Sequence, residues 1–426
     1  MRRHALVSNV TARVGALISL ALATLLVARV GGPTAVGVYA LLRVLPGIVG
    51  LVFSSGLPGA APFFLARPEE PDGRLRGTLV GLAVTTGIAG TLVWGASSPL
   101  IGRVFFEDLP VAVVALAGLT VLTQLLFATS KACLQGLDDM PGTNWAILLE
   151  EFIFLPGYLL LYGCGLDANL AIVIGLLIAD AVPTAISCVR LARRSFFEAL
   201  RRPTMSLART VCAFGARGQV GNLLSLLNFR LDFVLLGALT GPGVVGSYAI
   251  ASKFAELLRL PSLSLFWVLY PRFAKDRGAE AVARARWFLP RAGLLTLCGA
   301  LPLAALAEFV IPELYGTAFQ PAVVPAQILL LGLSLEGISG VIMAFLYGQG
   351  RPGLNSLVTG GGLIVTIVLD LLLIPRYGAT GAAWASTAAY LSTACMLVIS
   401  FQLVSTGRGR RRRREPMVVE AAGPVE

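Results

Sequence analysis

The chain has 426 residues, of which 56% are hydrophobic and only 13% are charged, and its mean hydropathy is +0.80. This composition is far more apolar than that of an average soluble domain, so it excludes that class and indicates a polytopic membrane protein. The formal net charge of +11 comes from Lys and Arg residues that gather in a few short segments.

Apolar runs of about 20 residues, long enough to cross about 30 Å of hydrocarbon as a helix, recur along the whole chain. We predict an all-α polytopic membrane protein of about twelve transmembrane helices joined by short loops. The predicted spans are residues 6–28, 36–65, 78–100, 111–134, 143–162, 168–191, 207–239, 244–270, 287–311, 322–347, 354–374 and 379–403. The first span follows a basic tip, as a secretory signal would, but it is too long and contains Arg13, so we interpret it as a retained helix.

The basic loops predict the orientation of these spans. With twelve alternating spans, the Arg-rich segments at the N-terminus, near residues 67–76, 190–202 and 271–286, and at 408–414 all fall on one side. The other side carries only Arg29, Arg103 and Arg376. Both termini should therefore be cytoplasmic. The final Arg cluster is typical of contact with anionic membrane lipids, and we expect no nucleic-acid partner.

The sequence contains an internal repeat. "GPTAVGVY" (Gly32 to Tyr39) and "GPGVVGSY" (Gly241 to Tyr248) agree at five positions, at an offset of 209 residues, and weaker matches follow in the same order. This pattern predicts two homologous six-helix lobes with parallel topology, which suits alternating access by rocking of the two lobes. The predicted parts are an N-lobe at 1–191, a cytoplasmic connector at 192–206, a C-lobe at 207–404 and a basic disordered tail at 405–426. We interpret the octets themselves as turns that close the first hairpin of each lobe.

Basic residues lie inside several predicted spans, where charges are costly and usually face a bundle interior or a wet cavity. On the second span, Tyr39 and Arg43 share one helix face, and on the eighth span Tyr248 begins a similar face. We predict that such stripes line a shared cationic cavity for an anionic headgroup, because Arg offers a planar donor fork to phosphate oxygens. The predicted substrate-binding residues are Arg13, Arg43, Arg217, Lys253 and Arg259. Arg13 and Arg217 lie near the cytoplasmic ends of their spans, so snorkelling to lipid phosphate is an equal alternative for them.

Acidic residues are embedded as well. The candidates for coupling to an ion, H⁺ or Na⁺, are Asp232, Glu256, Glu150 and Asp180. Glu151, Glu336 and Asp370 are also within spans. Pairing with the arginines is an equally good account of these carboxylates. Glu150 and Glu151 are neighbours in sequence and point about 100° apart on a helix, so we expect only one of them to face a cavity.

The sequence offers little for catalysis. Its one histidine, His4, is at the N-terminal tip, its six cysteines are isolated, and it has no P-loop. We therefore predict no catalytic residues, no metal site and no cofactor, and we expect a transporter that is not an enzyme.

Four segments together resemble the polysaccharide biosynthesis flippases of the multidrug/oligosaccharidyl-lipid/polysaccharide exporter superfamily. They are "ARVGGPTAVGVYAL", "NFRLDFVLLGALTGPGVVGSYAIASKFAELL", "IPELYGTAFQPA" and "LDLLLIPRYGATGAAWASTAAYL". The resemblance implies a twelve-helix, two-lobed bundle that moves undecaprenyl-pyrophosphate-linked oligosaccharides between leaflets of the bacterial inner membrane. It also implies a cationic central cavity, onto which Arg43 and Lys253 map through the repeated Tyr motif, and a polysaccharide polymerase as a candidate partner.

Three alternatives remain open from the sequence. A multidrug-type cation antiporter of the same fold would have an acid-dominated cavity. An integral-membrane glycan polymerase or ligase would be favoured by a long extramembrane loop, and the sequence has none. A duplicated helical bundle with a scaffolding role would leave the embedded charges without use.

Overall fold

The computed structural model describes residues 3–66, 73–198, 200–276 and 278–406, and these are almost entirely α-helical. Helices of the first half are α1 (Arg3–Ser54), α2 (Leu57–Leu65), α3 (Gly73–Phe105), α4 (Val111–Ala117), α5 (Leu119–Gly136), α6 (Met140–Gly163) and α7 (Ala168–Ala192). Helices of the second half are α8 (Met205–Thr240), α9 (Pro242–Glu256), α10 (Arg259–Lys275), α11 (Ala279–Tyr315), η1 (Thr317–Ala322), α12 (Val323–Leu333), α13 (Glu336–Gly348) and α14 (Pro352–Ser405). The predicted fold class is confirmed.

The twelve predicted spans can be followed through these helices. Among the described residues, seven helices are long and apolar enough to cross a membrane, or eight if the bent pair Thr317–Leu333 and Glu336–Gly348 forms one span. The two longest, α1 and α14, each contain a glycine with non-helical backbone, Gly32 (φ 68°) and Gly378 (φ 53°), where we expected a turn between two spans. The predicted spans at 207–239 and 244–270 correspond to α8 and to α9 with α10.

Breaks inside predicted spans are the main difference from the sequence analysis. The predicted span at 36–65 is interrupted between α1 and α2, where Ser55 and Gly56 both have positive φ (48° and 74°). The span at 322–347 bends by 41° between α12 and α13. Hydropathy cannot reveal such breaks because the flanking residues stay apolar through the bend.

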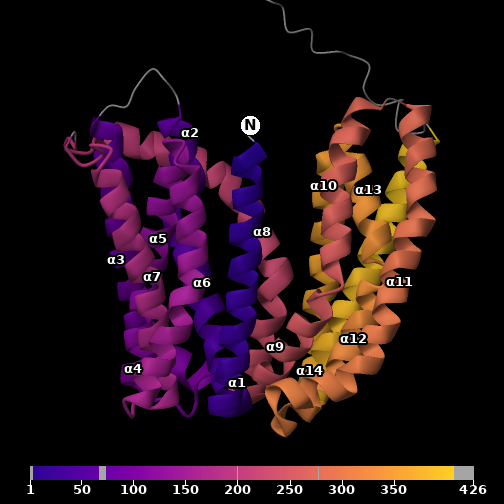
Figure 1. The fold of residues 1–426 in the computed structure, drawn as a ribbon, viewed down its shortest axis with the longest axis horizontal. Coiled ribbons are helices and arrows are strands. Elements are labelled where there is room, and N and C mark those ends of the chain that lie inside the picture. The colour runs from indigo at the N-terminus through magenta and orange to yellow at the C-terminus, as the bar shows by residue number, and fades with distance from the viewer. Residues whose placement is uncertain (1–2, 67–72, 199, 277, 407–426) are drawn as a thin grey trace, which may run out of the picture. The chain divides into compact units, whose positions relative to one another are not determined.

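The chain divides into two compact units, and the first holds Met1–Phe254, Ala305–Leu329 and Thr366–Ser386. In this unit α6 packs against α7 and α1, and α5 packs against α7 and α3 (Figure 1). The unit therefore combines the first half with all of α8 and η1 and with parts of α9, α11, α12 and α14.

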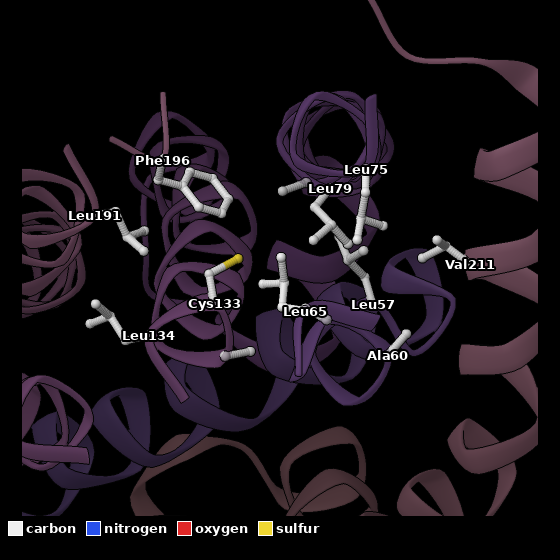
Figure 2. Close-up of a cluster of buried hydrophobic side chains, with 13 residues drawn as sticks. Leu57, Ala60, Leu65, Leu75, Leu79, Cys133, Leu134, Leu191, Phe196 and Val211 are labelled. Atoms are coloured by element: carbon white, nitrogen blue, oxygen red, sulfur yellow. The ribbon is translucent and has the colours of Figure 1, made fainter. Parts of the chain in front are cut away.

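An apolar core in the first unit ties α2, α3 and α5 to the segment that follows α7. Figure 2 shows Leu75 and Leu79 of α3 facing Leu57 and Leu65 of α2, with Phe196 nearby. The predicted connector at 192–206 is thus packed against the first half. Arg76 donates to the carbonyl oxygen of Ser195 at 2.8 Å, and the Arg201 amide donates to that of Gly73 at 3.0 Å.

The second unit holds Ala255–Ala304, Leu330–Val365 and Thr387–Glu426. Its core forms where α10 packs against α13. Phe273 of α10, Phe345 of α13 and Phe401 of α14 contribute edge-to-face ring contacts, and Ala281 and Ala285 of α11 are fully buried there.

Candidate functional site

Arg43 is the centre of a polar cluster in the first unit. It lies on the second part of α1, one turn after Tyr39. Its guanidinium donates to both carboxylate oxygens of Glu151 on α6, at 2.8 and 2.5 Å, and to the hydroxyl of Tyr39 at 2.9 Å. This is the bidentate geometry in which Arg and a carboxylate pair most strongly. Glu151 is therefore paired with an arginine, which is the alternative to ion coupling that the sequence left open for the embedded acids.

A cavity of about 250 Å³ adjoins this pair. Its charged lining residues are Arg43, Lys131 of α5, Glu150 of α6 and Asp180 of α7. Lys131 is 3.9 Å from Glu150, and the Thr123 hydroxyl donates to Asp180 at 2.9 Å. Glu150 faces this cavity while its neighbour Glu151 holds Arg43, as the 100° separation on the helix predicts. Two basic and two acidic side chains line it, so its charge is mixed.

Lys253 and Thr24 form a contact that joins the second half of the sequence to the first. Lys253 of α9 donates from Nζ to the hydroxyl of Thr24 on α1 at 2.5 Å. Thr24 is almost fully buried and donates in turn to the carbonyl oxygen of Leu20 at 2.8 Å. Thr24 belongs to the first predicted span and Lys253 to the eighth, and the first unit brings them into contact.

Tyr39 and Tyr248, the last residues of the two octets, each form a hydrogen bond with an ionisable side chain, and these two side chains have opposite charges. Tyr39 accepts a hydrogen bond from Arg43, whereas Tyr248 donates to the carboxylate of Asp232 at 2.6 Å. The Tyr248 hydroxyl is also 3.1 Å from that of Ser386 on α14. Both rings are buried, so the last tyrosine of each octet orients one ionisable group.

Asp370 of α14 completes a second candidate site beside Asp232. Its side chain is 0% exposed, and neither carboxylate oxygen has a hydrogen-bond partner among the described residues. Asp232 is close enough to act on it electrostatically. A buried carboxyl without a partner is costly and demands an explanation, such as a bound proton or cation. The sequence analysis noted Asp370 as embedded but did not select it.

The other predicted site residues lie elsewhere. Arg13 on α1 and Arg217 on α8 are exposed. Arg259 belongs to the second unit, where its guanidinium is 3.3 Å from Glu336, and Glu256 is half-buried at the start of that unit. The assignment of these residues to a substrate or ion site stays a prediction.

A charged cluster outside the spans escaped the sequence analysis. Asp139 precedes α6 and accepts a hydrogen bond from the Gly142 amide at 3.0 Å. Arg190 donates to its two oxygens at 2.9 and 2.8 Å, and Arg194 is 3.6 Å away. Burial alone would raise the pKa of Asp139, but the hydrogen bonds from Arg190 and Gly142 and the two positive charges outweigh it and lower that pKa. The sequence signal for this cluster was Asp139 directly before "MPG", because Asp at the start of a helix caps its free amides.

Within the described ranges, no group of three or more His, Cys, Asp or Glu side chains is arranged to hold a metal ion. The site has two chemical features: cationic donors next to carboxylates around Arg43, and the carboxyls of half-buried Asp232, which Tyr248 contacts, and of fully buried Asp370.

Comparisons with known proteins agree with this picture. A model of the polysaccharide biosynthesis protein family matches residues 5–276. The probable low-salt glycan biosynthesis flippase Agl15 of Haloferax volcanii is 20% identical over 372 residues, which cover 85% of this chain and 75% of that protein.

Two solved structures share the fold. The lipid II flippase MurJ in an inward closed conformation has a TM-score of 0.76 at 16% identity, covering 94% of this chain and 90% of that one. An inward-facing multidrug resistance MATE family transporter of the MOP superfamily has a TM-score of 0.72 at 14% identity, covering 94% and 96%. The chain therefore belongs to the polysaccharide biosynthesis protein family, as a multi-pass membrane protein with the fold of MOP-superfamily transporters.

Proposed function

We propose that this protein is a flippase that moves undecaprenyl-pyrophosphate-linked oligosaccharides across the bacterial inner membrane by alternating access. The observation that carries the proposal is the pair of basic side chains on equivalent spans of the repeat, Arg43 on α1 and Lys253 on α9. A pyrophosphate and its sugars cannot cross hydrocarbon unaided, whereas cationic donors inside the membrane can shelter the phosphates while the polyprenyl tail stays in lipid.

The test is translocation of a fluorescent lipid-pyrophosphate glycan in proteoliposomes. Arg43→Ala and Lys253→Ala should each abolish translocation while protein level and monodispersity are kept. Arg202→Ala is the matched control, because it removes the same charge from an exposed position in the connector. Undiminished translocation in the first two variants would refute the role of these cations.

We further propose that Asp232 and Asp370 form the site of the coupling ion, H⁺ or Na⁺. A bound cation would supply the partner that the buried Asp370 carboxyl lacks, and the Tyr248 hydroxyl, which contacts Asp232 and Ser386, is a further oxygen at Asp232. Separate gradients of H⁺ and Na⁺ across the proteoliposome membrane distinguish the two ions.

The rival proposal is a multidrug-type cation antiporter, which the mixed charge of the Arg43 cavity and the fold shared with a MATE transporter support. It predicts export of lipophilic cationic dyes and no dependence on a lipid-pyrophosphate glycan. Dye transport measured in the same proteoliposomes decides between the two.

The orientation and partners belong to the same proposal. Cytoplasmic termini follow from the basic loops, and labelling of cysteines introduced at each end in intact cells tests them. Anionic lipids at the basic tail and a polysaccharide polymerase as a neighbour in the membrane complete the proposed surroundings.

A further inference from the structure

The two octets of the repeat begin in the same way. Gly32 and Gly241 both have a left-handed backbone, with φ of 68° and 80°. Each is followed by a proline that opens a helix, Pro33 for the second part of α1 and Pro242 for α9. Proline suits the first helical turn, and glycine suits the positive φ before it. The octets thus place two equivalent helix starts in the first compact unit.

These helix starts pack against each other reciprocally. A Cβ added to Gly37 would lie 1.7 Å from the carbonyl oxygen of Pro242, and one added to Gly246 would lie 1.8 Å from that of Pro33. The sixth residue of each octet therefore contacts the second residue of the other, at distances that no side chain permits. The symmetry of the contact follows the symmetry of the repeat.

The contact also buries the residues around it. Val36 and Val245, the equivalent fifth residues, are 1% and 0% exposed. The third residues also face each other, since a Cβ on Gly243 would lie 3.6 Å from the Thr34 hydroxyl oxygen, which is ordinary van der Waals distance. Glycine at the two crossing points allows the backbones to touch directly, as small residues do where membrane helices approach closely.

Other segments of the second half join the first half at this same end. Arg29, three residues before Gly32, donates to the carbonyl oxygen of Leu314 at 2.6 Å and to that of Glu313, the last turn of α11. A Cβ on Gly378 of α14 would lie 3.6 Å from Val244. This explains why the first compact unit takes in Ala305–Leu329 and Thr366–Ser386.

We propose that the reciprocal glycine–proline contact is the gate at the octet end of the molecule, and that it must part in every transport cycle. The inference rests on the proposed alternating access. In a transporter made of two parallel repeats, equivalent elements meet near the symmetry axis at one end in one state and separate in the other. A contact between glycine and backbone carbonyl can open without unthreading interlocked side chains.

The first experiment measures opening without measuring transport. The six native cysteines, Cys133, Cys164, Cys188, Cys212, Cys298 and Cys395, are replaced, and Val245→Cys is added as a buried reporter. An impermeant maleimide then labels the reporter in nanodiscs only when the octets part. Gly37→Ala should increase the labelling rate about tenfold, a population change that corresponds to about 1.4 kcal/mol. Gly243→Ala is the matched control and should leave the rate unchanged. Equal rates in the two variants would overturn the proposal.

The second experiment does not depend on whether Gly37→Ala folds. Thr34→Cys with Gly243→Cys, in the same background without the reporter, should form a disulfide on oxidation. A Cβ on Gly243 would lie 3.6 Å from the Thr34 hydroxyl oxygen, which occupies the γ position that a cysteine sulfur would take. The oxidised protein should stop translocating the fluorescent lipid-pyrophosphate glycan, and a reductant should restore translocation. Full translocation with the disulfide intact would overturn the gate.

The proposed function can fail separately. If the reduced cysteine pair and the unmodified protein both leave the lipid-pyrophosphate glycan in place, while the Val245→Cys reporter still responds to Gly37→Ala, the cargo assignment is wrong and the gate stands.

Discussion

Glu151 should act as a competitor of the substrate for Arg43, and Glu151→Gln tests this. The guanidinium of Arg43 is already engaged by both Glu151 oxygens, so an incoming pyrophosphate has to displace them. The side chains are 29% and 13% exposed, which places the pair in a poorly solvated setting. Hydrogen bonds to a charged group are worth about 1.5–3 kcal/mol. Removing the charge of the competitor while keeping the shape of its side chain should therefore tighten binding roughly 10- to 150-fold.

The assay measures both affinity and turnover. Binding of the fluorescent lipid-pyrophosphate glycan to the purified protein should tighten in Glu151→Gln, and translocation should slow because release becomes harder. Glu308→Gln is the control, since it removes the same charge from an exposed position of α11 that does not line the cavity. Unchanged or weaker binding in Glu151→Gln would show that Arg43 and Glu151 are a permanent structural pair.

Two further predictions concern the other acidic residues. Asp139→Asn should lower the free energy of unfolding by about 1 kcal/mol at neutral pH, because Arg190 and Arg194 are partly exposed and screened. The folded-state pKa of Asp139 is lowered. The stability that its carboxylate contributes is therefore complete above the unfolded pKa of about 3.9 and disappears as pH falls through the folded pKa. Thermal unfolding in detergent across pH checks this, and a stability difference between the unmodified protein and Asp139→Asn that persists in acid contradicts it. Asp370→Asn should reduce the stimulation of transport by the driving cation about tenfold. Glu308→Gln, which changes an exposed carboxyl of α11, should leave the stimulation unchanged. Equal stimulation in both variants counts against the coupling site.

The sequence predicted the helices and the embedded charges because both leave local signals. A run of about 20 apolar residues identifies a span, and a charge within it stands out without any knowledge of its neighbours. The positions of Arg43, Lys253 and Asp232 followed from helical periodicity and the repeat. Periodicity gives the face of one helix, however, and does not say which other helix covers that face.

The sequence alone therefore could not predict which side chains form pairs. Arg43 and Glu151 are 108 residues apart, and Lys253 and Thr24 are 229 residues apart. The octets are another case in which the local sequence predicts only local structure. Each contains a glycine and a proline, which favour a turn, and a turn is all that the local pattern predicts. Their mutual contact depends on the packing of two segments separated by the whole first half, so only the structure could reveal it.

The internal pairing of Arg43 is compatible with a substrate role because a transporter must also be stable when empty. A guanidinium left alone inside the membrane carries a large desolvation cost, which a nearby carboxylate offsets. Arg43 meets this requirement with Glu151, and Arg259, in the second unit, meets it with Glu336 at 3.3 Å. A binding site built from permanent cations in a bilayer therefore needs exchangeable anions of its own. Under the proposed function, the affinity for a pyrophosphate would be set by the difference between two ion pairs, which would make it weak enough to allow release on the far side of the membrane.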